Sequence, residues 1–117
     1  MSDRNVIPVS RPNRRRSRRQ RPKSGTRAQF FRSPLGLGPN IASTVLDISE
    51  TGIRLVVREE VSVGQECEVR ILGNGGRSIK LVADIVWSVP TADGQFCVGA
   101  GFQKTVSYAD LIALARP

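Results

Sequence analysis

Two groups of side chains in this sequence have the types and spacing needed to bind an anionic, planar molecule. One is the arginine cluster Arg14-Arg15-Arg16-Ser17-Arg18-Arg19, and the other is Asp47-Ile48-Ser49 followed by Gly52. A guanidinium group donates paired hydrogen bonds to phosphates and to base edges, and its plane stacks on a base. A carboxylate accepts hydrogen bonds from the donor edge of a base. Together the two groups predict recognition of a phosphorylated base, with no chemical reaction.

The residue types that most enzymes use for proton transfer and metal binding are scarce. The chain has no His, which excludes His-based acid–base catalysis and most zinc sites. Cys67 and Cys97 stand thirty positions apart, a spacing that matches no metal or redox motif, so we expect two reduced thiols. We therefore predict a protein that is not an enzyme and that has neither a cofactor nor a metal.

Charge is distributed very unevenly along the 117 residues. Residues 1–32 hold eleven of the 18 Lys and Arg but only Asp3 of the ten acids, whereas the remainder is close to neutral. Residues 1–25 also show no apolar period, so we expect a flexible basic arm in front of one compact domain at 26–117. No apolar run is long enough to span a membrane, and the N-terminus lacks the apolar core of a secretory signal. These features predict a cytoplasmic monomer without membrane insertion.

After residue 25 the sequence alternates between apolar and polar residues in short segments that turn residues separate. This pattern predicts half-buried strands, and the hairpin signal Gly73-Asn74-Gly75-Gly76 separates two of them. Ser107 is a good N-cap for a short helix that carries Leu111, Ile112 and Leu114. The expected strands are 26–32, 42–49, 53–58, 66–72, 78–89 and 95–102. Six short antiparallel strands with one closing helix predict an all-β fold, a six-stranded barrel.

Alternation also assigns side chains to the inside or the outside of that barrel. Leu46 and Ile48 take the inward positions, which places Asp47 and Ser49 side by side on the outside. Gly52 is expected to have a positive φ where the chain turns into the next strand. Trp87 and Phe102 fall on the inward side, so we expect core residues there. An alternative is that Asp47-Ile48-Ser49 is an ordinary strand end with a side-chain-capped turn.

An R-x-x-x-R element followed by D-x-S-x-x-G resembles the signature of the PilZ family of cyclic-di-GMP receptors. Ile85-Val86-Trp87 and Gly99-Ala100-Gly101-Phe102 are similar to the last two strands of that family, and the resemblance covers residues 11–115. It implies cyclic di-GMP as the ligand. It also implies a ligand site made of Arg14, Arg15, Arg18, Arg19, Asp47, Ser49 and Gly52. Among the arginine registers 11/15, 14/18 and 15/19, we favour Arg15 and Arg19, with Arg14 as an additional ligand-binding arginine.

The resemblance further implies that ligand binding orders the arm against the barrel and creates a surface for a downstream protein partner. Two alternatives remain. The chain is either a small-barrel RNA- or DNA-binding protein that uses the same basic arm, or a PilZ-like adaptor that does not bind nucleotide.

Overall fold

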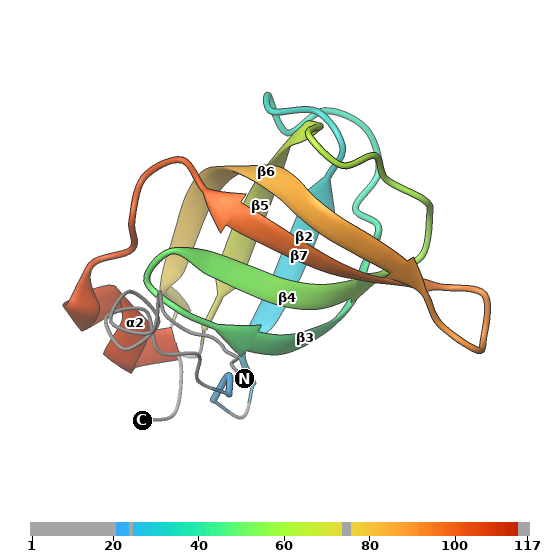
Figure 1. Cartoon of the computed structure of the whole chain (residues 1–117). Helices are drawn as coiled ribbons and strands as arrows, with labels where there is room; N and C mark the ends of the chain where they lie inside the picture. Colours follow the sequence, from blue (N-terminus) through green and yellow to red (C-terminus); the bar gives the residue numbers. More distant parts are fainter. Residues whose placement is uncertain (1–20, 24, 74–75, 115–117) are drawn as a thin grey trace, which may run out of the picture.

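The structure is a computed structural model and describes residues 21–23, 25–73 and 76–114. The predicted all-β fold is confirmed. Six strands form one antiparallel sheet that curls into a nearly closed barrel, and a single helix follows them (Figure 1). The elements are β2 (Arg27–Phe31), β3 (Ala42–Ile48), β4 (Gly52–Val57), β5 (Glu66–Leu72), β6 (Ser78–Pro90), β7 (Phe96–Phe102) and α2 (Tyr108–Leu114).

The strands follow one another in the order β2-β5-β6-β7-β4-β3, so β2 and β3 are the two ends of the sheet. Asn40 joins these ends, because its Oδ1 accepts hydrogen bonds from the Phe30 N–H at 2.8 Å and from the Ala42 N–H at 3.0 Å. The Ile41 N–H also donates to the Phe30 carbonyl oxygen at 3.0 Å. These bonds satisfy backbone groups that two free sheet edges would otherwise expose.

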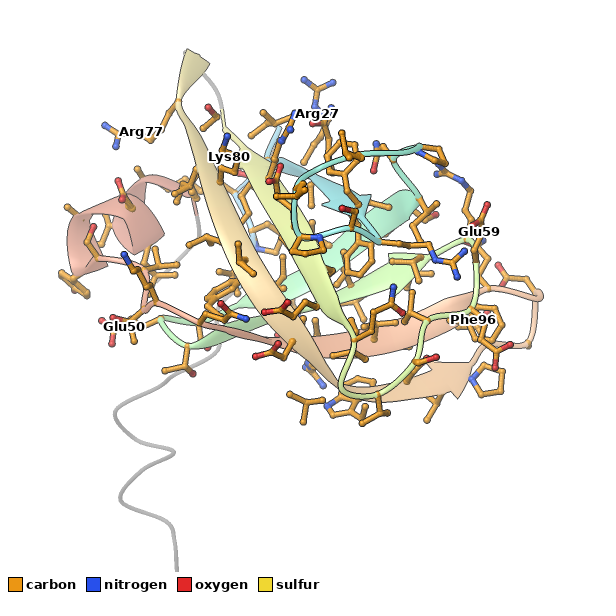
Figure 2. The ribbon with its side chains drawn as sticks, turned by 90° about the horizontal axis from the view of Figure 1, so that it is seen from above. Arg27, Glu50, Glu59, Arg77, Lys80 and Phe96 are labelled. Carbon is orange, nitrogen blue, oxygen red and sulfur yellow. The ribbon has the colours of Figure 1, made fainter. Side chains whose placement is uncertain are left out.

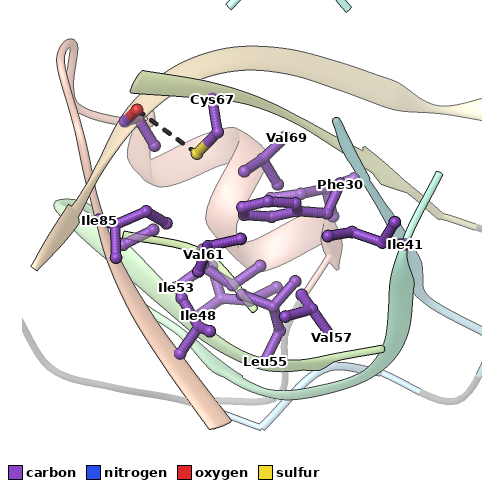
Figure 3. Close-up of a cluster of buried hydrophobic side chains, with 14 of the residues drawn as sticks. Phe30, Ile41, Ile48, Ile53, Leu55, Val57, Val61, Cys67, Val69 and Ile85 are labelled. Carbon is purple, nitrogen blue, oxygen red and sulfur yellow. Dashed lines mark hydrogen bonds between the residues drawn. The ribbon is translucent and has the colours of Figure 1, made fainter. Parts of the chain in front are cut away.

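The barrel interior is filled by β-branched and aromatic side chains from every strand, as Figure 3 shows for Phe30, Ile48 and Ile85. Cys67 also points inward, is fully buried, and donates a hydrogen bond from Sγ to the Ala83 carbonyl oxygen at 3.4 Å. Both cysteines are free thiols, as predicted, and Cys97 is half-buried on the outer side. The period-two pattern predicted β5 at the residue ranges that the structure shows.

Helix α2 covers one end of the barrel, with Leu111 and Leu114 buried in the core. Its predicted N-cap is present, because the Ser107 Oγ accepts a hydrogen bond from the Asp110 N–H at 3.1 Å. Ile112 lies on the outer side of the helix and is exposed. Figure 1 places α2 at the same end of the barrel as the turn between β3 and β4, and the Val106 N–H donates to the Glu50 carbonyl oxygen at 2.8 Å.

Three β-bulges interrupt the simple side-chain alternation. Two lie in β3, between Ala42 and Thr44 and between Val45 and Asp47, and the third lies in β6 between Ile85 and Trp87. A bulge places two residues of one strand opposite one residue of its partner, so the residues beyond it no longer follow the earlier parity. Leu46, which was predicted to be inward, is therefore 39% exposed.

Candidate ligand site

The turn between β3 and β4 is closed by Ser49. The Ser49 Oγ accepts hydrogen bonds from the Gly52 N–H at 3.1 Å and from the Thr51 N–H at 3.3 Å. The Ser49 N–H in turn donates to the Gly52 carbonyl oxygen at 2.8 Å. This is the side-chain-capped turn that the sequence left open as an alternative. Ser49 is only 1% exposed, so the prediction that it lies on the outside beside Asp47 is wrong.

Gly52 is required for a different reason from the one predicted. Its φ is not positive, because it begins strand β4 in ordinary extended backbone. Its partner across the ladder is Gly101 of β7, and a Cβ added at Gly52 would lie 2.5 Å from the carbonyl oxygen of Ala100. Glycine therefore allows the turn to approach the β7 backbone closely.

Asp47 lies on the outer side of the barrel, as predicted, and forms an ion pair with Arg54 of the neighbouring strand. Both the Nε and an Nη of Arg54 donate to Oδ2 of Asp47, the former at 2.7 Å. Asp47 is 7% exposed, whereas the Arg54 side chain is 43% exposed. The carboxylate raises the pKa of Arg54 above its ordinary value, chiefly through this hydrogen bond. Side chains from two neighbouring strands thus hold the carboxylate in one orientation.

Arg54 was absent from the predicted site, although the sequence contains a signal for it. The turn at 49–52 makes Ile48 pair with Ile53, and the next pair outward is then Asp47 with Arg54. Directly opposite residues in an antiparallel pair have adjacent side chains, and opposite charges there attract. Counting outward from the turn would have found this ion pair.

Trp87 also belongs to the outer surface, which contradicts its prediction as a core residue. The bulge after Ile85 reverses the parity of β6, so Trp87 pairs with Gly99, and Gly99 in turn pairs with Arg54. The indole covers Gly99: a Cβ there would lie 2.8 Å from Cζ2 and closer still to Nε1. Asp47, Arg54, Gly99 and Trp87 therefore form one cross-strand row over β3, β4, β7 and β6. Phe102 is partly buried against the core, as expected.

The arginine cluster, with the four predicted ligand residues Arg14, Arg15, Arg18 and Arg19, lies outside the described residues. The described chain begins at Arg21, and the Lys23 N–H donates to the carbonyl oxygen of Leu114 at 3.1 Å. Residue 23 is thus attached to the end of α2, the element beside the β3–β4 turn. The described chain therefore begins at the end of the barrel where Ser49 and Gly52 lie.

The model of the PilZ domain family matches residues 13–116, a range that includes the arginine cluster and the whole barrel. This chain belongs to the PilZ domain family, a family of nucleotide-binding receptors whose ligand is cyclic di-GMP. No curated protein and no solved structure matches the chain. Within the described residues there is no group of three side chains suited to a metal ion. The helix in this part of the chain is too short to cross a membrane.

Proposed function

We propose that this chain is a cyclic-di-GMP receptor that performs no chemistry and acts in the cytoplasm as a monomer. The observation that carries the proposal is the fixed carboxylate of Asp47, held by Arg54 on the outer face of a PilZ barrel and aligned with the indole of Trp87. This row offers an acceptor, a cation and an aromatic ring. A guanine base attached to a phosphodiester has a complementary partner for each.

The base supplies the specificity in this proposal. The donor edge of guanine matches the acceptor Asp47, while O6, N7 and the phosphates match guanidinium groups. We assign those guanidinium groups to Arg15 and Arg19 of the arm, with Arg14 as the additional arginine and Arg18 as the alternative in the 14/18 register. Trp87 provides a π face for stacking at the far end of the row.

Ser49 and Gly52 have a different role in the proposal from the one that the sequence suggested. Ser49 caps the turn, and Gly52 brings that turn against β7. Both therefore position Asp47, and neither is assigned to the ligand itself. This division accounts for a serine and a glycine in the motif without placing them in contact with the nucleotide.

The arm of residues 1–25 supplies the second half of the site. Five residues lie between Arg15 and Arg21, and an extended chain from one to the other spans roughly 20 Å. We propose that this reach lets the cluster lie over the β3–β4 turn. We propose that ligand binding orders the arm there and presents a new surface to a downstream protein, which is a disorder-to-order switch.

The test is the substitution Asp47→Ala, with Glu60→Ala as the control, because Glu60 is an exposed acid and its loss changes the net charge equally. Asp47→Ala should weaken cyclic-di-GMP binding by about 1–3 kcal/mol, the cost of losing a charged hydrogen-bond partner. Glu60→Ala should leave it unchanged. A carboxylate repels phosphates, so binding of RNA through the basic arm should be unaffected or slightly strengthened by either change.

Salt dependence separates the same two functions. Binding to many phosphates of a nucleic acid falls steeply with salt, whereas a ligand with two phosphates gives a shallow slope. If Asp47→Ala has no effect on cyclic-di-GMP affinity and RNA binds tightly in a salt-sensitive way, this proposal is wrong and the nucleic-acid alternative replaces it.

A further inference from the structure

The loop between β2 and β3 exposes two leucines that lie outside the core. Leu35 is 75% exposed and Leu37 is 64% exposed. The loop that carries them is hydrogen-bonded to itself. The Leu35 N–H donates to the Ser33 Oγ at 3.1 Å, and the Gly36 N–H donates to the Ser33 carbonyl oxygen at 3.0 Å. Two large apolar side chains, two positions apart on such a loop, are suited to contact an apolar phase.

The same loop is seated on an arginine of β5 whose orientation is fixed. A Cβ added at Gly36 would lie 2.5 Å from the Glu68 Oε2 and 2.7 Å from Nη2 of Arg70. The Arg70 Nε donates to that Glu68 oxygen at 2.6 Å, and the guanidinium carbon lies 4.7 Å from the centre of the Phe31 ring. The backbone between the two leucines therefore lies directly against this ion pair.

Arg70 is one of several cations on the outer face of β2, β5 and β6. Lys80 pairs directly with Arg70 across the β5–β6 ladder, although like charges opposite each other repel. Arg27 lies two residues before Gln29, which pairs with Arg70 on the other side, and Figure 2 shows Arg27 and Lys80 projecting from this side of the barrel. Lys80 also lines a hollow together with Lys104. The four cations Arg27, Arg70, Lys80 and Lys104 are called the basic face below.

The charge of the basic face is only partly balanced by acids. Among the described residues, Arg27, Lys80 and Lys104 form no ion pair, and only Arg70 has a carboxylate partner. Two further acids, Glu66 and Asp84, are on the outer side of the same two strands. They pair with each other's strand four positions beyond Arg70 and Lys80, or roughly 13 Å away. The basic face is therefore suited to an anionic partner.

An anionic lipid bilayer matches the leucines and the cations together. Apolar side chains at a membrane surface enter the boundary between headgroups and acyl chains, while neighbouring Lys and Arg side chains contact lipid phosphates. The hollow between Arg70 and Lys80 is also lined by Ser78, so it offers a hydroxyl as well as two cations to a phosphate. A nucleic acid would use the cations alone, because two leucines that project from a loop add nothing to phosphate binding.

We propose that Leu35, Leu37 and the basic face attach this chain peripherally to an anionic lipid bilayer. The chain then lies on the bilayer surface without spanning it. In the sheet order, β5 is three positions from β4, so the two strands are on opposite sides of the barrel. The Asp47 row is centred on the β4 side and stays accessible. This inference goes beyond the proposed function and does not rest on it.

The experiment measures co-sedimentation of the full chain with vesicles of phosphatidylcholine and phosphatidylglycerol in equal parts, without nucleotide. The test variant is Leu35→Ser, Leu37→Ser. The matched control is Val86→Ser, Val89→Ser, which removes two apolar side chains of β6 that are 59% and 50% exposed. All chains keep the arginine cluster, whose charge also attracts anionic vesicles, so that contribution cancels in the comparison. Circular dichroism verifies that each variant is folded.

We expect the leucine variant to bind these vesicles about ten-fold or more weakly than the wild-type chain, because each leucine loses apolar burial. The valine control should stay within about two-fold. Lys80→Gln, Lys104→Gln should weaken binding roughly ten-fold, and the wild-type chain should bind pure phosphatidylcholine vesicles far more weakly.

Four results would overturn the inference. The first is a leucine variant that binds within about two-fold of the wild-type chain, since the arginine cluster alone would then account for binding. The second is an equal loss in the leucine variant and the valine control. The third is equal binding of the wild-type chain to both kinds of vesicle. The fourth is no binding to either, which would leave an acidic protein segment as the partner of this surface.

Discussion

Replacing Gly52 by alanine tests the structural role that the β3–β4 turn assigns to this glycine. The added methyl group would meet the Ala100 carbonyl oxygen at 2.5 Å, and that atom is backbone in the middle of the barrel. It cannot move aside as the end of a side chain can. Forcing an extra methyl into such a packed contact costs about 1–3 kcal/mol.

Gly101 is the matched control, because it pairs directly with Gly52 across the same ladder. A Cβ at Gly101 would meet the Val86 Cγ2 at 3.6 Å, which is an ordinary van der Waals contact. Both substitutions restrict the unfolded chain in the same way, so that contribution cancels in the comparison. We expect Gly52→Ala to be about 2 kcal/mol less stable than Gly101→Ala, with a Tm lower by roughly 8 °C.

Urea denaturation followed by circular dichroism measures the difference directly. Gly101→Ala should lie within about 0.5 kcal/mol of the wild-type chain. Equal stabilities for the two variants, or a less stable Gly101→Ala, would refute the close approach as the reason for glycine at position 52.

Three further predictions follow from the packing. Gly99→Ala should displace the indole of Trp87, the single tryptophan of the chain, and so shift its fluorescence emission and weaken cyclic-di-GMP binding, while Gly101→Ala leaves both unchanged. Leu114→Ala should cost about 2–5 kcal/mol in urea denaturation, because it removes a buried side chain from the helix that closes the barrel; a cost below 1 kcal/mol would show that α2 is dispensable. Burial raises the pKa of Cys67 in the folded chain to about 12, above its ordinary value of 9.0. Between these two pH values the unfolded chain therefore binds fewer protons than the folded chain. The free energy of unfolding should then fall as the pH rises above 9, by no more than about 1.4 kcal/mol per pH unit. Cys67→Ala should remove this component of the pH dependence, and an unchanged slope in that variant would contradict it.

The fold was largely predictable because the alternation of apolar and polar residues is a direct consequence of strand geometry. Glu66–Leu72 has a strict period of two, and β5 occupies those residues with Cys67, Val69 and Ile71 fully buried. Within the strands, alternation failed where a bulge interrupts it. Leu46 and Trp87 both lie at bulges, and neither residue carries a sequence signal that distinguishes it from its regular neighbours.

The candidate site was predicted less completely, for reasons that differ from residue to residue. Asp47 was found because its motif and its parity agree. The burial of the Ser49 hydroxyl was not predicted. It accepts hydrogen bonds from N–H groups of the turn, and the alternation of apolar and polar residues gives no information about which turn N–H groups need an acceptor. Gly52 was identified with the wrong cause, since close approach to Ala100 depends on a strand nearly fifty residues away. The Arg54 partner of Asp47 follows from the hairpin register alone.

Isothermal titration of the full chain with cyclic di-GMP tests the central claim most directly, with GMP and a short RNA as controls. The account predicts saturable binding of cyclic di-GMP that a rise in salt weakens only slightly, and much weaker binding of GMP, which has one base and one phosphate. Absence of heat with cyclic di-GMP, alongside tight binding of the RNA that disappears at high salt, would contradict it.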